Sequence, residues 1–365
     1  MESEKKAGFW KKNWLNVLMI ALSVGILAGF VFSSDFDAML TLLWNARSRW
    51  YYFVMAVACM FVFFLMEALG VYILLKRFCP KATFGVSFRT TMVGQFFNCT
   101  TPFSTGGQPM QIYAMSKKGV SVGVGTSVLL IRYVISMSVV AGYGMILMAI
   151  HYRYFAAAIP AFGLWLGIGL GLYILLVVGV VSLLCFPKLA HRTADGLVRF
   201  LAKIHLVKRE TFRRQQVSQE IDNCFNSFHM MKNHKGCLIS SVVITAIQFL
   251  AQFSITWFVY CAFGCPGHNG YWKIVGAQLF VLLISSYFPT PGATGASELS
   301  YFAIFNRVFN GREYVASAML IWRAITFYLP IVFGSFFAIG IQKSKEIDDA
   351  SALPKRAEPD KIQVE

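Results

Sequence analysis

Four ionisable side chains interrupt long apolar runs in this sequence: Glu67 and Arg132 in the first half, Glu298 and Arg323 in the second. A charge at the centre of a bilayer costs about 3 kcal/mol or more, so each group is expected to face a cavity or a partner. The arginine fork can hold phosphate or carboxylate through two parallel hydrogen bonds. Two interpretations therefore stand side by side. Each arginine forms a structural ion pair with one of the acids, or the arginines bind an anionic ligand.

A short motif precedes each arginine. Residues 101–106 read Thr-Pro-Phe-Ser-Thr-Gly, residues 290–295 read Thr-Pro-Gly-Ala-Thr-Gly, and an arginine follows each copy about 30 residues later. Matched offsets indicate an internal repeat. Proline and glycine break helices, and the backbone N–H groups of residues 105–107 and 294–296 are expected to cradle an anionic group. The candidate substrate-binding residues are Glu67, Gln95, Asn98, Thr101, Pro102, Ser104, Thr105, Gly106, Gly107, Gln108, Arg132, Thr290, Pro291, Gly292, Thr294, Gly295, Ser297, Glu298 and Arg323.

The composition places these residues in a membrane. The 365 residues are 57% hydrophobic and 14% charged, and their mean hydropathy is +0.59. Six apolar runs are long enough to span a bilayer, and two more are interrupted by the repeated motif. We therefore predict an all-α polytopic membrane protein with about six spanning helices and two re-entrant broken-helix hairpins in an inverted repeat. The spans are residues 14–33, 51–75, 126–150, 160–186, 237–263 and 314–341, and the hairpins are residues 86–110 and 274–305.

The net charge of +16 is concentrated in a few segments. Residues 187–236 hold ten lysines and arginines against four acids, and this amphipathic loop is expected to meet anionic lipids of the inner leaflet. Basic loops mark the cytoplasmic side, so both termini are predicted to be cytoplasmic. Residues 1–13 form a basic leader, 14–341 a single transmembrane domain, and 342–365 a disordered tail. The first hairpin then enters from the cytoplasm and the second from outside.

Several function classes find no support in the sequence. Phosphate-binding, nucleophile-elbow and zinc-protease motifs are absent, as is a C-x-x-C pair. We expect no metal and no cofactor. Nucleic acid is not an expected partner, with one exception named below, and the sequence leaves open a homo-oligomer.

Residues 94–109, the helix of Arg132 and residues 289–298 together resemble the lysylphosphatidylglycerol synthase transmembrane family, the flippase-like membrane region of the multiple peptide resistance factors. The resemblance implies a bacterial cytoplasmic membrane and a region that moves aminoacylated phosphatidylglycerol to the outer leaflet, which confers resistance to cationic antimicrobial peptides. In that family a separate soluble aminoacyltransferase domain makes the lipid, and this sequence lacks it.

The leading hypothesis is a flippase that moves a phospholipid such as phosphatidylglycerol or its lysyl ester between leaflets. One alternative is a phosphatidylglycerol lysyltransferase that takes lysine from lysyl-tRNA, or a membrane component or partner of a separate synthase. Another is a translocase of polyprenyl-phosphate or glycolipid carriers. An alternating-access mechanism would suit an inverted repeat whose broken helices meet near the midplane.

Overall fold

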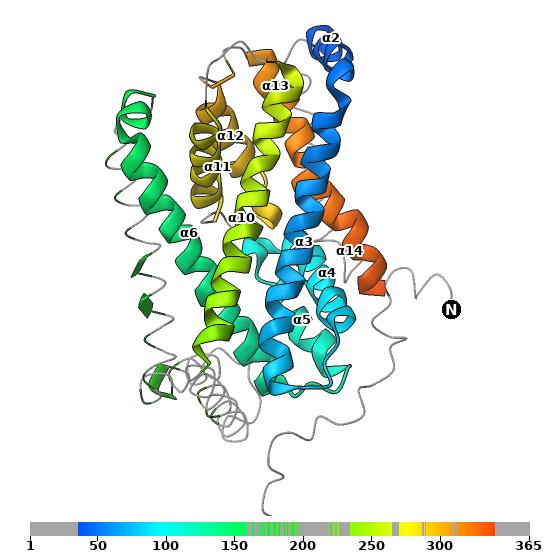
Figure 1. Ribbon diagram of the computed structural model, residues 1–365, viewed down its shortest axis with the longest axis vertical. Coiled ribbons are helices and arrows are strands. Elements are labelled where there is room, and N and C mark those ends of the chain that lie inside the picture. The colour runs from blue at the N-terminus through cyan, green and yellow to red at the C-terminus, as the bar shows by residue number, and fades with distance from the viewer. Residues whose placement is uncertain are drawn as a thin grey trace, which may run out of the picture.

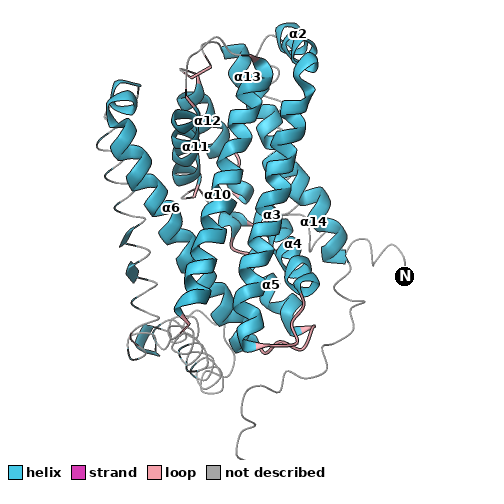
Figure 2. Ribbon diagram, in the orientation of Figure 1, coloured by secondary structure: helices cyan, strands magenta, loops and turns pink. Residues whose placement is uncertain are grey.

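The computed structural model describes residues 36–158, 234–264, 270–306 and 308–339 apart from 287, 289, 310 and 311, together with scattered positions between 163 and 225. Within this part of the chain the regular structure is entirely helical (Figure 2). The predicted leader, first span and tail lie outside the described residues, as do most of the fourth span and of the loop 187–236.

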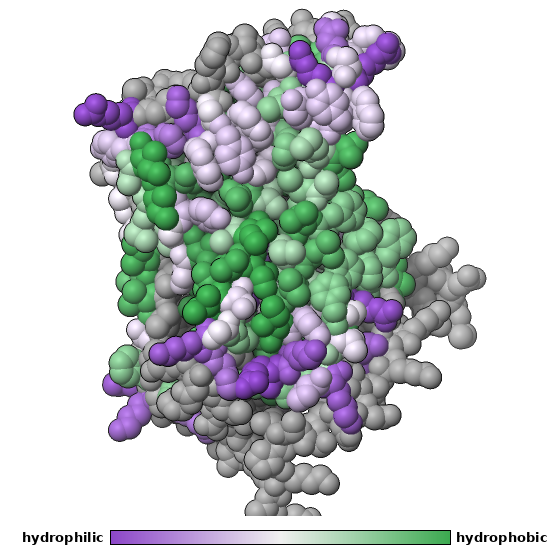
Figure 3. Space-filling view, viewed as in Figure 1, coloured by the Kyte–Doolittle hydropathy of each residue, from purple (hydrophilic) through white to green (hydrophobic). Residues whose placement is uncertain are grey.

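Four helical stretches of the described chain are long and apolar enough to cross a membrane: Thr41–Phe78, Val122–Arg153, Lys235–Phe263 and Tyr314–Ile339. They confirm the second, third, fifth and sixth predicted spans. Figure 3 shows an apolar band across the middle of the molecule between more polar ends, as a bilayer requires. The elements are α2 (Phe36–Ala46), η1 (Arg47–Arg49), α3 (Trp50–Phe78), α6 (Val122–Ala158), α10 (Lys235–Phe263), α13 (Arg312–Arg323), the π-helix η4 (Ala324–Tyr328) and α14 (Leu329–Ile339).

Both interrupted runs form broken hairpins, as predicted. The first consists of α4 (Phe84–Thr100), η2 (Pro102–Ser104) and α5 (Gly107–Ser116), and the second of α11 (Tyr271–Ser285), η3 (Pro291–Ala293) and α12 (Ala296–Phe305). The first occupies the half of the molecule where α3 ends, and the second the half where α10 ends (Figure 1). Their turns contact each other, η2 against η3. The two hairpins therefore enter from opposite ends and meet in the middle.

The two hairpin turns share two backbone hydrogen bonds and one left-handed residue. The Ser104 N–H donates to the Thr101 carbonyl at 3.2 Å, and the Ala293 N–H donates to the Thr290 carbonyl at 3.0 Å. The next amide in each copy donates to the proline carbonyl, at 3.2 and 3.1 Å. Ser104 and Ala293 both have φ of 53°, a left-handed conformation that few non-glycine residues adopt. The sequence repeat is thus also a structural repeat.

The spanning helices hold the hairpins through close packing. Helix α3 packs along α10, and α4 packs against α14. A side chain at Gly334 of α14 would meet the Met92 carbonyl at 2.8 Å, so glycine permits this close approach to α4. Around the second hairpin, the buried ring of Tyr301 stacks on Trp322 with centroids 4.9 Å apart. These contacts fix the position of both turns relative to the spans.

Candidate functional site

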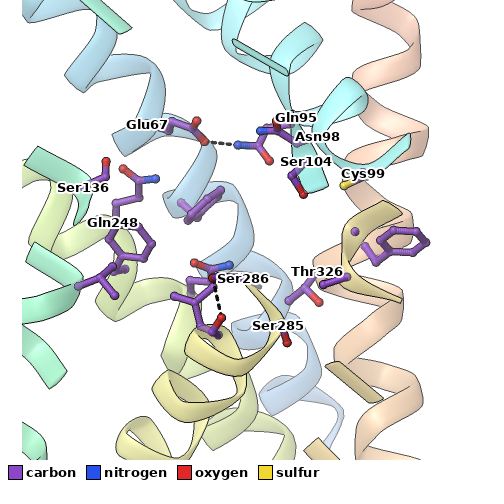
Figure 4. Close-up of a pocket in the computed structure, with 18 of the residues that line it drawn as sticks. Glu67, Gln95, Asn98, Cys99, Ser104, Ser136, Gln248, Ser285, Ser286 and Thr326 are labelled. Atoms are coloured by element: carbon purple, nitrogen blue, oxygen red, sulfur yellow. Dashed lines mark hydrogen bonds between the residues drawn. The ribbon is translucent and has the colours of Figure 1, made fainter. Parts of the chain in front are cut away.

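A cavity of about 540 Å³ lies where the two hairpins meet the spanning helices. Its lining comes from α3, α4, α5, α6, α10, α11, both turns and the α13–η4 stretch. Figure 4 shows Glu67, Gln95 and Asn98 on one side, Ser136 and Gln248 on another, and Ser285, Ser286 and Thr326 towards the second hairpin. The volume falls in the range of about 300–1,000 Å³ that is usual for small-ligand pockets. It can therefore hold a lipid headgroup.

The predicted site residues divide into two groups. The members of one group line the cavity. The members of the other group, which include Glu298 next to the cavity, lie outside the lining and form the turns or pack behind them. The lining group is Glu67, Gln95, Asn98, Ser104, Gln108, Arg132, Gly292, Ser297 and Arg323. The second group is Thr101, Pro102, Thr105, Gly106, Gly107, Thr290, Pro291, Thr294, Gly295 and Glu298.

Glu67 enters the cavity from the middle of α3. The Gln95 side-chain amide on α4 donates a hydrogen bond to its carboxylate (Figure 4). This contact ties the first hairpin to α3 through one charged and one neutral side chain. The carboxylate has a second oxygen, and the amide keeps its carbonyl oxygen as an acceptor.

Arg132 crosses the cavity wall from α6 to α10. One terminal nitrogen of its guanidinium donates to the Thr245 hydroxyl and the other to the Gln248 side-chain carbonyl. The guanidinium lies over Gly70 of α3, where a Cβ atom would be 2.7 Å from the Arg132 Cζ. Arg132 is only 6% exposed, and its Nε has no hydrogen-bond partner among the described residues. Each terminal nitrogen therefore already donates one hydrogen bond to α10, so the outer edge of the guanidinium is shared with the protein.

Arg323 forms the buried ion pair that the sequence suggested. Its Nε lies 2.7 Å from Glu298 Oε1, and the side chains are 5% and 1% exposed. The other carboxylate oxygen accepts from the Gly295 N–H at 2.7 Å and from the Ser297 hydroxyl at 3.1 Å. Arg323 also donates to the Gly292 carbonyl at 3.3 Å. The pair therefore fastens the second turn to α13, whereas Arg132 has neutral partners.

The proposed backbone cradle is smaller than expected. The Thr105 and Thr294 amides donate to proline carbonyls within their own turns. The Gly106 amide donates to Thr101 Oγ1 at 2.9 Å, and the Gly295 amide to Glu298. These four N–H groups complete the turns, because a buried amide without a partner is costly. They are not available to a ligand in this conformation.

Side-chain amides and hydroxyls that were not among the predicted site residues complete the lining. Gln278 lies 12 residues before Thr290, whereas Gln95 lies 6 residues before Thr101, so the two are not at equivalent offsets in the repeat. The others are single polar residues inside apolar spans, which was the only signal the sequence offered. The added polar residues are Gln111, Ser136, Gln248, Gln252, Gln278, Ser285, Ser286 and Thr326.

The charges around the cavity nearly cancel. Glu67 and Arg132 oppose each other in sign, and Arg323 is neutralised by Glu298. Among the described residues, no group of three His, Cys, Asp and Glu side chains is placed to hold a metal ion. The arrangement offers hydrogen bonds and a polar volume at membrane depth.

Comparison with known proteins agrees with this architecture. Residues 18–334 match the family described as the lysylphosphatidylglycerol synthase TM region. A UPF0104 membrane protein of Archaeoglobus fulgidus is 22% identical over 329 residues, which cover 87% of this chain and 94% of that protein. The family match spans most of the chain, including both hairpins and all four described spans up to Gly334. The chain is therefore a multi-pass membrane protein that belongs to the lysylphosphatidylglycerol synthase transmembrane family.

Proposed function

We propose that the protein is a lipid flippase that moves a phospholipid headgroup through the central cavity while the acyl chains stay in the bilayer. The observation that carries this proposal is the pair of oppositely directed hairpins whose turns meet at a polar cavity. Irregular backbone at membrane depth is tolerated where protein or a water-filled cavity satisfies it. Inverted broken helices around a central site are the arrangement of alternating-access transporters.

The proposal extends to the lipid that is moved and to the membrane in which the protein lies. The family description names lysylphosphatidylglycerol synthase, which favours phosphatidylglycerol or its lysyl ester as the first lipids to test. The basic residues that follow α3 and α5, among them Lys76, Arg77 and Lys117, favour the cytoplasmic side for that end of the bundle. We therefore place the protein in the cytoplasmic membrane with both termini inside, where its role would include resistance to cationic antimicrobial peptides.

Transport in proteoliposomes tests the proposal directly. Fluorescent phosphatidylglycerol, its lysyl ester and a polyprenyl phosphate are placed in both leaflets, and an impermeant quencher reports the fraction that crosses. Ser136 lines the cavity from α6, and Ser138 is exposed two residues further along the same helix. Ser136→Trp should fill the cavity and reduce crossing to the protein-free rate. Ser138→Trp should leave crossing unchanged.

The same preparation separates translocation from synthesis. Purified protein is incubated with lysyl-tRNA carrying labelled lysine and with phosphatidylglycerol. A flippase gives lipid crossing and no labelled lipid. Labelled lysyl-lipid would favour the lysyltransferase alternative. Crossing that is equally fast in Ser136→Trp and in the natural sequence would show that the cavity is not the pathway.

A further inference from the structure

Six glutamines line the cavity and come from four separate helices. They are Gln95 on α4, Gln108 and Gln111 on α5, Gln248 and Gln252 on α10, and Gln278 on α11. A carboxamide presents a carbonyl acceptor and an N–H₂ donor from one side chain. Polar groups in a membrane interior are costly, so a wall built from them indicates a ligand that exchanges hydrogen bonds with it.

The wall of the cavity keeps both hydrogen-bond donors and hydrogen-bond acceptors that could bind a ligand. Gln252 has a buried side-chain carbonyl oxygen without a partner among the described residues, which is an unmet acceptor. Arg132, itself more than nine-tenths buried, has an Nε–H without a partner there, which is an unmet donor. The amide of Gln248 accepts from Arg132 and keeps its own N–H₂, and the amide of Gln95 donates to Glu67 and keeps its carbonyl. The wall thus keeps both open donors and open acceptors.

Ligand groups differ in the hydrogen bonds that they can form with such a wall. An ammonium only donates and a phosphate only accepts, whereas a hydroxyl does both. A dicationic lysyl headgroup would meet Glu67 as the one lining carboxylate. Phosphate would meet Arg132, whose terminal nitrogens each already donate one hydrogen bond, and Arg323, whose charge is paired with Glu298. A ring of hydroxyls matches a wall that offers both donors and acceptors, and the half-buried ring of Phe249 in the lining offers an apolar surface for its C–H groups.

We propose that the central cavity recognises a lipid headgroup of the sugar or ring-polyol class through its hydroxyls. The assignment rests on the proposed function for the statement that the ligand is a lipid. The glutamines bind the hydroxyls, and Arg132 and Glu67 orient the ring through their open donor and acceptor.

Binding of three dioctanoyl lipids to the full chain in detergent tests the assignment by calorimetry. Phosphatidylinositol carries a ring polyol, phosphatidylglycerol a short polyol, and phosphatidylethanolamine an ammonium without hydroxyls. The expected order of affinity follows the number of hydroxyls. Phosphatidylinositol should bind at least about tenfold more tightly than phosphatidylethanolamine, since each added hydrogen bond contributes a few-fold. Equal affinities, or tightest binding of phosphatidylethanolamine, would overturn the proposal.

Two variants that change no charge test where the headgroup binds. Gln252→Leu removes both the carbonyl acceptor and the N–H₂ donor, so it should weaken phosphatidylinositol by a few-fold or more and phosphatidylethanolamine by less, because an ammonium can use only the acceptor. Ser136→Ala should weaken phosphatidylinositol a few-fold, while Ser138→Ala on the exposed face of the same helix should not. If Gln252→Leu and Ser136→Ala both bind phosphatidylinositol like the natural sequence, the cavity is not the headgroup site.

Transport with the same headgroups separates this proposal from the proposed function. Selective crossing of inositol lipid supports both. Equal crossing of all three lipids, blocked by Ser136→Trp, would leave translocation intact and refute the headgroup assignment. Selective binding of phosphatidylinositol without any crossing would support the headgroup assignment and refute translocation.

Discussion

The ion pair between Arg323 and Glu298 gives a quantitative prediction for the second hairpin. The two side chains are 5% and 1% exposed, so removing either charge leaves the other buried without its partner. Breaking a buried pair in this way costs about 3–5 kcal/mol. In Arg323→Gln the carboxylate keeps the Gly295 amide and the Ser297 hydroxyl, so the lower end of that range applies. We expect a loss of about 3 kcal/mol in the free energy of unfolding.

A double-mutant cycle isolates the pair from the rest of the turn. Glu298→Gln alone leaves a buried guanidinium and should also cost about 3 kcal/mol. The double variant leaves no uncompensated charge and should cost no more than either single change. The coupling energy is therefore expected to be about 3 kcal/mol. Reversible unfolding by SDS in mixed micelles, followed by tryptophan fluorescence, measures all four corners of the cycle.

The control is the exposed Arg153 near the end of the same helix as Arg132. Arg153→Gln should change the free energy of unfolding by less than about 0.5 kcal/mol. The reasoning fails if both single variants at Arg323 and Glu298 cost under about 1 kcal/mol and their effects simply add. That result would mean that the pair is hydrated and does not hold the turn to α13.

Two further predictions address the turns and the orientation. Ala293 has φ of 53°, so Ala293→Gly should raise the free energy of unfolding by about 0.5 kcal/mol, whereas Ala303→Gly at an exposed interior position of α12 should lower it by about 0.5–1 kcal/mol. SDS unfolding of both variants tests the opposite signs, and the same sign for both would contradict the strain argument. Lys117 is exposed at the end of α5, so Lys117→Cys in a cysteine-free chain should react with an impermeant maleimide only from the cytoplasmic side. Labelling from outside would reverse the proposed orientation.

The architecture of the described chain followed from the sequence because a membrane leaves few choices. An apolar run of about 20 residues has to be helical, since no water is present to satisfy its backbone. Proline and glycine in the middle of such a run then require a break, as at Pro102 and Pro291. The four interior charges stood out for the same reason, and Arg323 and Glu298 did prove to be partners.

The lining of the cavity was only partly predictable. Gln248 and Gln252 lie on α10, and nothing in their spacing fixes how α10 is rotated against α3 and α6. The partners of Arg132 therefore came from the structure, where the absence of a side chain at Gly70 lets the guanidinium lie flat between α3 and α10.

Arg132 and Arg323 show that the repeat does not predict the role of each residue in the two halves. Both hairpin turns keep two of the same backbone hydrogen bonds and a left-handed residue at the same place, whereas Gly295 has a positive φ and its counterpart Gly106 does not. The amide that follows is capped by the Thr101 hydroxyl in the first copy and by the Glu298 carboxylate in the second. The buried carboxylate of Glu298 in the second turn needs a cation as its partner, and Arg323 is that cation. The first turn needs no cation, so Arg132, at a similar offset, is left to bind α10 and to face the cavity. Equivalent positions in the two halves therefore share a fold without sharing a chemical role.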